Sequence, residues 1–164
     1  MTKSEKNIFI LEDDFLQQYS LKRALESLGY RVVGCTASAQ EALESLKALQ
    51  ETPTERPSIL LVDIRLRGPL DGIEFVASLP PELKVPHIFI TAFNDEQHFT
   101  RSIQTNPAGY LLKPFGKLAL DYQIRLALRN QENEVQLLEK TALLDSFLSG
   151  SKDGIILIDK EGRI

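Results

Sequence analysis

The sequence predicts an α/β fold, a doubly wound parallel sheet of five strands with an extended C-terminal helix. Between Asn7 and Phe115, short apolar segments alternate with amphipathic helical patterns, the order that builds parallel strands through right-handed crossovers. The segment Ser58–Ile64 is apolar at almost every position, as expected of a strand covered on both faces. From Lys117 to Ser149 no Gly or Pro interrupts a run of good helix formers, which predicts the long helix.

The predicted strands are short runs rich in aliphatic and β-branched residues. They are Asn7–Leu11, Tyr30–Ala37, Ser58–Ile64, His87–Phe93 and Gly109–Phe115. In the helix after the first strand, Gly29 stands where a C-terminal cap belongs. The stripe that this helix is expected to bury comprises Leu16, Tyr19, Ala24, Leu25 and Leu28. Ser38 and Glu41 predict a capping box at the start of the second helix.

The composition is that of an ordinary soluble protein, with 43% hydrophobic and 26% charged residues. A net charge of −4 does not indicate a nucleic-acid-binding surface. The single cysteine, Cys35, cannot form an internal disulfide, which favours a reducing compartment. The N-terminus is too polar for a signal peptide, and no apolar run approaches the ~18 residues of a membrane span. We therefore expect a cytoplasmic protein, with no membrane partner and no nucleic-acid partner within these residues.

Polar residues that can take part in binding or catalysis lie where the predicted strands end. Glu12 and Asp13 follow the first strand, Asp63 lies at the end of the third, Thr91 of the fourth and Lys113 of the fifth. Taken singly, each has an ordinary structural explanation, such as a solvated acid, a β-branched strand residue or a surface lysine. Doubly wound folds, however, place their sites outside the carboxyl ends of the strands, so these residues are expected to converge.

The convergent groups suit phosphoryl transfer. Carboxylates bind the hard cation Mg²⁺, and a hydroxyl and an ammonium can contact phosphoryl oxygens. A carboxylate can also act as nucleophile and form an aspartyl phosphate. Two like charges about 4 Å apart repel by roughly 4 kcal/mol at an effective dielectric near 20, and a bound cation would offset that repulsion.

The motifs "ILEDD", "LLVDIRL" with a later "DG", "FITAF" and "GYLLKPF" resemble the receiver domain of bacterial two-component response regulators. The resemblance extends from Lys6 to about Leu128. It implies a flavodoxin-like sheet of order 2-1-3-4-5, Mg²⁺ as cofactor, and a histidine kinase or histidine phosphotransfer protein as partner. It also implies a signalling switch that catalyses its own phosphorylation, not an enzyme with turnover.

For the phosphorylation site, the resemblance implies that Asp63 is the phosphoacceptor. Asp13 would bind Mg²⁺ directly and Glu12 through water, with the backbone carbonyl of Arg65 as a further ligand. Asp14 has no role in the family pattern and is expected to cap the first helix.

For the switch, the resemblance implies that Thr91 supplies a hydroxyl drawn to the phosphoryl group and that Lys113 pairs with a phosphoryl oxygen. Lys113–Pro114 would be a cis peptide bond. Tyr110 stands where the family keeps an aromatic residue that moves inward on activation.

Two features depart from the family pattern. The loop "IRLRGPLDG" after Asp63 is longer than the usual turn, so residues 68–72 are expected to differ in shape. Arg65 and Phe93 are bulky residues beside the route for hydrolytic water. We therefore expect slow self-dephosphorylation.

The predicted long helix contains a short heptad seam, which favours a parallel two-stranded coil and therefore a homodimer. The seam comprises Ile124, Leu128, Val135, Leu138 and Ala142, with Gln131 as a polar break. The alternative is a single amphipathic helix that packs on its own sheet.

The last residues, "DGIILIDKEGRI", resemble the opening hairpin of a PAS sensor domain. We therefore divide the chain into a receiver core (1–116), a helical linker (117–149) and the beginning of a PAS-like domain (150–164). The chain is then expected to be part of a longer protein with a downstream domain.

The sequence also bears on three other functions. A haloacid-dehalogenase-type phosphatase also uses a strand-end aspartate and Mg²⁺, but its second aspartate would stand at position 65, which is Arg65. A phosphorylation-independent dimerisation module would keep the fold without the chemistry. Dinucleotide binding is excluded because no Gly-x-Gly-x-x-Gly follows a strand.

Overall fold

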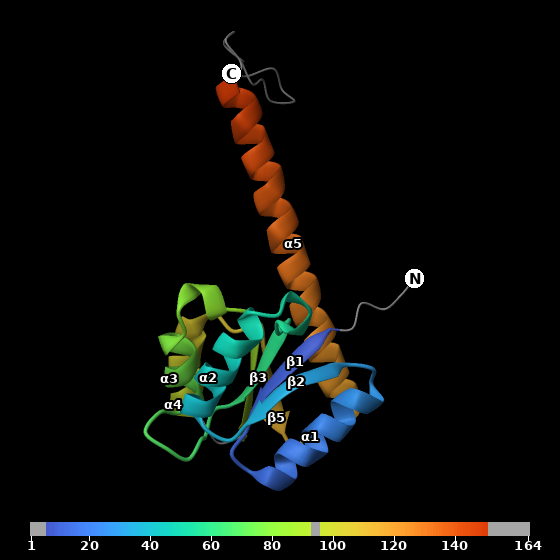
Figure 1. Ribbon diagram of the computed structural model, residues 1–164, viewed down its shortest axis with the longest axis vertical. Coiled ribbons are helices and arrows are strands. Elements are labelled where there is room, and N and C mark those ends of the chain that lie inside the picture. Colours follow the sequence, from blue (N-terminus) through green and yellow to red (C-terminus); the bar gives the residue numbers. More distant parts are fainter. Residues whose placement is uncertain (1–5, 93–95, 151–164) are drawn as a thin grey trace. The chain divides into compact units, whose positions relative to one another are not determined.

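The computed structural model describes residues 6–92 and 96–150 and contains one parallel sheet of five strands in the order β2-β1-β3-β4-β5 (Figure 1). The strands are β1 (Asn7–Leu11), β2 (Arg31–Thr36), β3 (Ile59–Asp63), β4 (His87–Ala92) and β5 (Gly109–Lys113). This confirms the predicted α/β fold and strand order. Phe93 and the PAS-like hairpin lie outside the described residues.

Helices cover both faces of the sheet (Figure 1). The α-helices are α1 (Phe15–Ser27), α2 (Ala39–Gln50), α3 (Gly72–Ser78), α4 (Glu96–Ser102) and α5 (Lys117–Gly150). Short 3₁₀ helices are η1 (Pro53–Glu55), η2 (Pro81–Leu83) and η3 (Ile103–Thr105). Helices α1 and α5 pack on one face, and α2 and α3 pack on the other.

The two central strands explain the continuous apolar segments of the sequence. Every residue of β1 and β3 is buried, and alternate side chains enter opposite cores. Ile8 and Ile10 face the α1 and α5 side, whereas Phe9 and Leu11 face the α2 and α3 side. Polar side chains of these two strands therefore lie only at their termini, Asn7 at the start of β1 and Asp63 at the end of β3.

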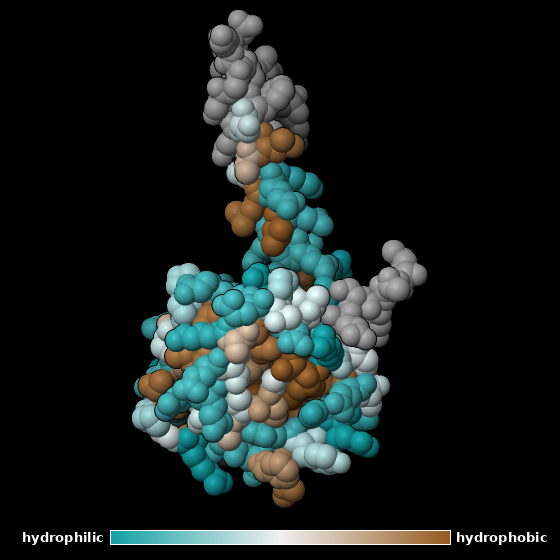
Figure 2. All heavy atoms as spheres, viewed as in Figure 1, coloured by the Kyte–Doolittle hydropathy of each residue, from teal (hydrophilic) through white to brown (hydrophobic). Residues whose placement is uncertain are grey.

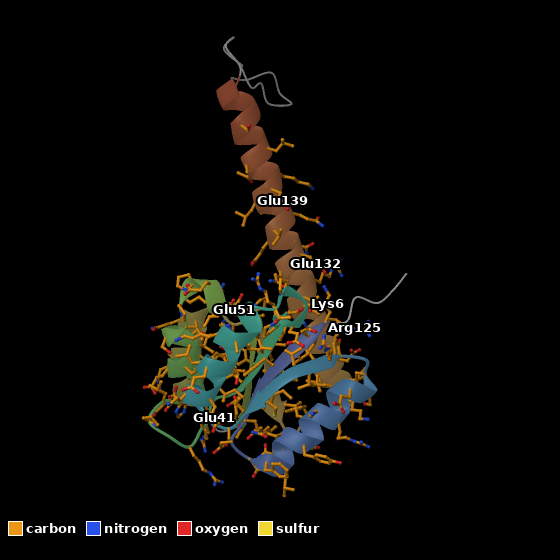
Figure 3. The ribbon with its side chains drawn as sticks, in the orientation of Figure 1. Lys6, Glu41, Glu51, Arg125, Glu132 and Glu139 are labelled. Atoms are coloured by element: carbon orange, nitrogen blue, oxygen red, sulfur yellow. The ribbon has the colours of Figure 1, made fainter. Side chains whose placement is uncertain are left out.

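Side-chain caps fix two helix starts beside the sheet. The Asp14 carboxylate accepts the Gln17 backbone N–H at 2.9 Å, which confirms the predicted cap of α1. The Ser38 hydroxyl accepts the Glu41 N–H at 3.3 Å, so the Ser38 half of the predicted capping box of α2 is present. Glu41, at the N-terminal end of α2 in Figure 3, accepts the N–H of Ala37 and does not close the box on Ser38.

The predicted buried stripe of α1 is partly wrong. Leu16 and Tyr19 are 75% and 58% exposed, and Leu21 and Leu25 are the buried residues. At about 100° per residue, Leu16 lies roughly 180° around the helix from Leu25, so the two cannot face the same sheet. The first turns of α1 thus present apolar side chains to solvent.

The predicted heptad seam is also partly wrong. Ile124 is fully buried and Leu128 is 8% exposed, and both lie in the core under the sheet with Leu111. The alternative of a helix that packs on its own sheet therefore holds for this part of α5. The exposed residues of the predicted seam include Val135 and Leu138.

The chain divides into two compact units, Met1–Arg129 and Asn130–Ile164. In the second unit, α5 carries exposed apolar side chains among hydrophilic ones (Figure 2). They include Val135, Leu137, Leu138 and Leu143. Over the residues described, no helix combines the length and hydropathy needed to cross a membrane.

His87 is a buried polar residue at the start of β4. Its Nε2 lies 3.0 Å from the Thr105 hydroxyl, and its ring meets Phe89 edge to face at 5.0 Å. Burial lowers the pKa of His87 from 6.5 to about 4, and the charge of Lys84 acts in the same direction against a backbone hydrogen bond of Val85. The imidazole is therefore neutral in the folded protein near pH 7.

This depressed pKa predicts an acid-sensitive contribution to stability. Between pH 6.5 and 4 the unfolded chain binds a proton at His87 that the folded chain does not, so stability falls as the pH falls. We expect wild type to lose about 2 to 3 kcal/mol more than His87→Gln between pH 7 and 4.5. Urea unfolding at both pH values measures the difference, and equal losses would contradict the buried neutral imidazole.

Candidate functional site

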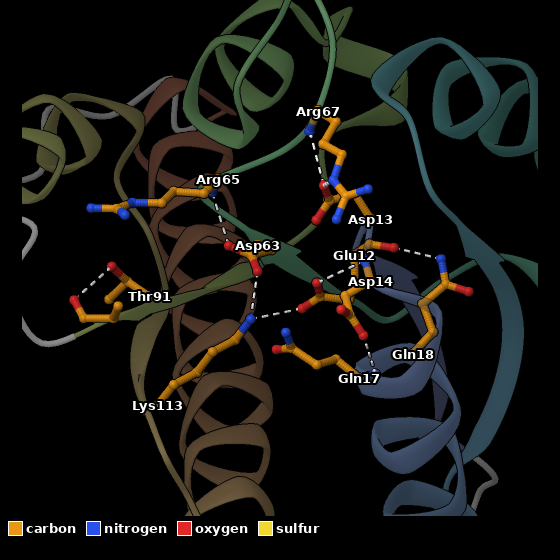
Figure 4. Close-up of polar contacts among 11 residues, drawn as sticks. Glu12, Asp13, Asp14, Gln17, Gln18, Asp63, Arg65, Arg67, Thr91 and Lys113 are labelled. Atoms are coloured by element: carbon orange, nitrogen blue, oxygen red, sulfur yellow. Dashed lines mark hydrogen bonds and ion pairs between the residues drawn. The ribbon is translucent and has the colours of Figure 1, made fainter.

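The carboxyl ends of β1, β3 and β5 bring the predicted acids and lysine together (Figure 4). One carboxylate oxygen from each of Glu12, Asp13 and Asp63 lies within 4.8 Å of the others. The Lys113 Nζ donates to Glu12 Oε2 at 2.9 Å and to Asp63 Oδ2 at 2.5 Å. The predicted convergence is thus present within the residues described.

Glu12 and Lys113 form a charge pair that is largely shielded from water. Burial raises the pKa of Glu12 to about 7, and the charge of Asp63 adds to that rise, whereas Lys113 lowers it. Burial alone would lower the pKa of Lys113, but its hydrogen bonds to Asp63 and Glu12 raise it overall. Lys113 is therefore the cation that balances Glu12 and Asp63 in this structure.

Backbone amides hold the other acid oxygens. Asp63 Oδ1 accepts the N–H of Arg65 at 2.8 Å, and Asp13 Oδ2 accepts the N–H of Arg67 at 3.1 Å. The loop after β3 is thus bound to both acids. Arg67 also brings its guanidinium to Asp13, with Nε 3.1 Å from Oδ2, a contact that the sequence analysis did not identify.

Thr91 lies beside this cluster on the neighbouring strand. It follows Ile90, the ladder partner of Asp63, and is 5% exposed. Its hydroxyl donates to the carbonyl oxygen of Ala92 at 3.3 Å (Figure 4). The structure therefore brings Thr91 to the predicted edge, with its hydroxyl bonded to its own strand.

Tyr110 belongs to the other face of β5, away from the acids. Its ring lies 4.9 Å from Phe99 of α4 and 6.1 Å from Phe89 of β4, centroid to centroid. Its hydroxyl is 2.7 Å from the hydroxyl of the fully buried Ser102. This contact ties β5 to α4, and no motif in the sequence indicates it.

The loop after β3 ends in a second set of contacts that the sequence analysis missed. Asp71 and Glu74 form a reciprocal capping box at the start of α3. Arg101 of α4 donates to Asp71 Oδ2 at 2.8 Å and lies 3.4 Å from Glu74 Oε1. The Asp-x-x-Glu spacing was the available signal for the cap. No local sequence signal indicates the ion pair between this cap and Arg101 of α4.

A groove of about 1170 Å³ opens beside the cluster, between α1 and the segment that joins β5 to α5. Glu12 and Lys113 line one part of it, and Leu21, Phe115 and Leu120 contribute apolar surface. The Lys113–Pro114 peptide bond in this segment is cis, as the resemblance implied. The acid cluster is thus reached from an accessible, partly apolar surface.

The donor set of the cluster fits Mg²⁺. Its possible ligand atoms are carboxylate oxygens from Glu12, Asp13 and Asp63, the hard ligands that this cation takes in proteins. The protein cations that contact these acids are the Lys113 ammonium and the Arg67 guanidinium. A bound metal ion can take over their role of balancing the negative charge. The same atoms can serve phosphoryl transfer, with a carboxylate nucleophile and an ammonium beside it.

Comparison with known families agrees with this geometry. The response regulator receiver domain matches residues 8–125, so the chain belongs to the receiver domain family of two-component response regulators. Receiver domains are regulatory signalling modules that act with histidine kinases or phosphotransfer proteins and bind Mg²⁺ through an acidic pocket.

Among curated proteins, the chain is 33% identical over 123 residues to the transcriptional regulatory protein CrdR of Helicobacter pylori, covering 74% of this chain and 54% of CrdR. It is 33% identical over 123 residues to the KDP operon transcriptional regulatory protein KdpE of Escherichia coli, covering 75% of this chain and 51% of KdpE. The chain thus spans about half the length of these relatives.

Two solved structures are similar in fold and sequence. The signal receiver domain of a modulated diguanylate cyclase from Desulfovibrio desulfuricans is 39% identical, with a TM-score of 0.68 over 78% of this chain and 97% of that one. The N-terminal domain of a response regulator/sensory box/GGDEF 3-domain protein from Carboxydothermus hydrogenoformans is 25% identical. Its TM-score is 0.70 over 79% of this chain and 99% of that one.

Proposed function

We propose that the chain is a phosphorylation-dependent switch that accepts a phosphoryl group on Asp63 from a histidine kinase or a histidine phosphotransfer protein. The observation that carries the proposal is the contact of Asp63 with Lys113 inside a cluster of two further acids. An exposed acidic patch would not need a lysine held against two buried carboxylates.

In the proposed reaction, a carboxylate oxygen of Asp63 attacks the phosphorus atom of the donor's phosphohistidine. The new oxygen–phosphorus bond forms as the nitrogen–phosphorus bond breaks, and the electron pair of that bond stays on the imidazole nitrogen. Glu12, Asp13, Asp63 and the carbonyl of Arg65 would hold Mg²⁺, which offsets the negative charge brought together by the acids and the phosphoryl group.

Lys113 changes partner in this scheme. It now donates to Oδ2 of Asp63, whose carboxylate would become an acyl phosphate. An acyl phosphate keeps less negative charge on the carboxyl oxygens and adds anionic phosphoryl oxygens, so the ammonium follows the charge. The groove between α1 and the β5–α5 segment offers the donor a surface that reaches Lys113.

The relay from the site is proposed to use Thr91 and Tyr110. The Thr91 hydroxyl would exchange the Ala92 carbonyl for a phosphoryl oxygen and draw the end of β4 toward Asp63. Tyr110 would then move relative to α4, which requires its contact with Ser102 to change. The output surface would include α4, β5 and α5.

The proposed output passes along α5 to a downstream domain in the same chain, with residues 1–116, 117–149 and 150–164 as receiver, linker and PAS-like beginning. The three-domain Carboxydothermus protein, whose N-terminal domain is similar, supports a further domain after the receiver. Exposed Val135, Leu137, Leu138 and Leu143 support a homodimer through the linker, because a lone helix would leave them in water.

The phosphorylation proposal is tested by intact mass spectrometry after incubation with acetyl phosphate and Mg²⁺. We expect one phosphoryl group on wild type and none on Asp63→Ala or in the presence of EDTA. Asp14→Ala is the matched control, since it removes a neighbouring acid whose role is to cap α1. It should still be phosphorylated.

Two results would redirect the proposal. A folded wild-type chain that takes up no phosphoryl group would favour the phosphorylation-independent dimerisation module. Repeated release of inorganic phosphate with fast turnover would favour a phosphatase over a switch that loses its phosphoryl group slowly.

Sedimentation velocity on the phosphorylated sample and its untreated control tests the proposed homodimer.

A further inference from the structure

Asp13 differs from the other two acids in the cation that accompanies it. Glu12 and Asp63 share Lys113, whereas Asp13 Oδ2 lies 3.1 Å from Arg67 Nε and accepts the Arg67 backbone N–H at 3.1 Å (Figure 4). The Asp13 side chain is 15% exposed and that of Arg67 is 84% exposed. A surface arginine therefore reaches in from the loop after β3 to an acid that is mostly shielded from solvent.

We propose that Arg67 is a tethered counter-cation that occupies Asp13 in the metal-free receiver, leaves it when a divalent cation binds, and thereby weakens the affinity of the site for that cation. The inference deepens the proposed function, on which it rests, because it concerns the same acid cluster. It adds a residue that tunes the site without serving as a metal ligand.

The Arg67 guanidinium and a divalent cation compete for Asp13 because both are positively charged. A guanidinium and a divalent cation that both approach one carboxylate repel each other, so the two are not bound to Asp13 together at full strength. The backbone N–H of Arg67 carries no net charge and can stay on the carboxylate, which has about four lone-pair sites. The side chain alone is thus the group that the metal displaces.

The exposure of Arg67 makes its release easy. The departing guanidinium is already largely hydrated, so little desolvation has to be reversed. Lys113 is different, since its side chain is only 25% exposed and it is bound by two carboxylates. Arg67 is therefore suited to adjust affinity, whereas Lys113 is suited to stay with the site.

The size of the effect follows from the strength of exposed ion pairs. Exposed ion pairs usually contribute little free energy, enough for about a two- to fivefold change in an equilibrium constant. We expect Arg67→Gln to bind Mg²⁺ about threefold more tightly than wild type at low salt. Arg67→Lys, which keeps the charge, should bind within about twofold of wild type, and Arg67→Glu should bind more tightly than Arg67→Gln.

The test is isothermal titration of Mg²⁺ into the metal-free full chain at low and at high salt. Lys47→Gln is the matched control, because it removes one positive charge from an exposed position in the last turn of α2. This turn lies toward the amino-terminal ends of the strands, whereas the acids lie at the carboxyl ends. It should bind Mg²⁺ like wild type. The gain of Arg67→Gln should shrink at high salt, since exposed charges are screened within about 3 Å at 1 M ionic strength.

A second readout follows the side chain itself. The Nε–H resonance of Arg67, assigned by its loss in Arg67→Gln, should shift as Mg²⁺ is added to wild type. Equal affinities for wild type, Arg67→Gln and Arg67→Glu would overturn the inference while leaving the proposed function intact. Failure of all variants to bind Mg²⁺ would overturn both.

Discussion

Lys113→Met is expected to destabilise the metal-free receiver by about 3 kcal/mol at pH 8, because it leaves buried carboxylates without their cation. Glu12 and Asp63 have side chains only 2% and 9% exposed, and Lys113 donates to both. Methionine replaces the lysine side chain as far as Cε and lacks only the terminal ammonium group, so it can keep the apolar contacts. The loss should therefore come from charge and not from packing.

The pH dependence distinguishes this cause from a general loss of structure. Burial already raises the pKa of Glu12 to about 7, and Lys113 is the group that opposes the rise. Without Lys113 the Glu12 carboxyl is expected to take up a proton at higher pH, which removes the uncompensated charge. The destabilisation should therefore be smaller at pH 6 than at pH 8.

Urea unfolding of wild type and Lys113→Met, in EDTA and in Mg²⁺, measures the effect. Mg²⁺ should stabilise the variant more than wild type, because the metal supplies the missing positive charge. Lys117→Met is the matched control, since Lys117 is an exposed lysine of the same region that donates to the Ser27 hydroxyl. Equal stability of the two variants would show that Lys113 does not balance the acids.

Much of the fold could be predicted because its signals are local. Strand β1 was predicted at Asn7–Leu11, where it is found, because five buried residues end at a polar boundary. The convergence of Asp63 with Glu12 could be predicted because all strands run parallel and their carboxyl ends share one edge. The cap by Asp14 follows from residue type and position.

The two main failures have different physical causes. The spacing of Ile124 and Leu128 fits a coiled-coil seam and also a helix that packs on its sheet, and only tertiary contact decides between them. Leu16 is hydrophobic but lies about 180° around α1 from the buried Leu25, so helix geometry alone excludes it from the face that contacts the sheet. Periodicity specifies a face of a helix, not its partner.

The contacts that the sequence analysis missed join residues far apart in the chain. Arg67 and Asp13 are separated by 54 positions, and their pairing depends on the path of the loop after β3. Ser102 meets Tyr110 because α4 lies against β5. Neither pair carries a motif, so only the folded chain identifies them.

Gly72→Ala adds a single methyl group, and we expect it to destabilise the protein more than a methyl group added at any other glycine near the site. A Cβ at Gly72 would lie 2.1 Å from the carbonyl oxygen of Asp63 and 2.8 Å from Cγ1 of Val62. The Gly72 N–H donates to the Ile64 carbonyl at 2.9 Å, which holds α3 directly against the end of β3. The "DG" of the sequence thus combines a helix cap, Asp71, with a residue that must lack a side chain.

Relief of this clash requires backbone movement, because the atom that is met is a main-chain oxygen of the proposed phosphoacceptor. We expect Gly72→Ala to lose about 3 kcal/mol of stability, at the upper end of what overpacking usually costs. The remaining folded protein should be phosphorylated more slowly by acetyl phosphate, since Asp63 is displaced relative to Lys113. Urea unfolding and intact mass measured against time report the two effects separately.

Gly116→Ala provides the control for both measurements. A Cβ at Gly116 would meet no heavy atom within 4 Å, so the same added methyl group makes no clash. Because Gly116 precedes α5 and its carbonyl accepts the Leu120 N–H, as an N-cap does, we expect a loss of less than about 1 kcal/mol from the poorer capping by alanine. Similar stability and phosphorylation rates for the two variants would show that the approach of α3 to β3 tolerates a side chain. A loss confined to Gly72→Ala would instead show that the geometry of Asp63 depends on a glycine nine residues further along the chain.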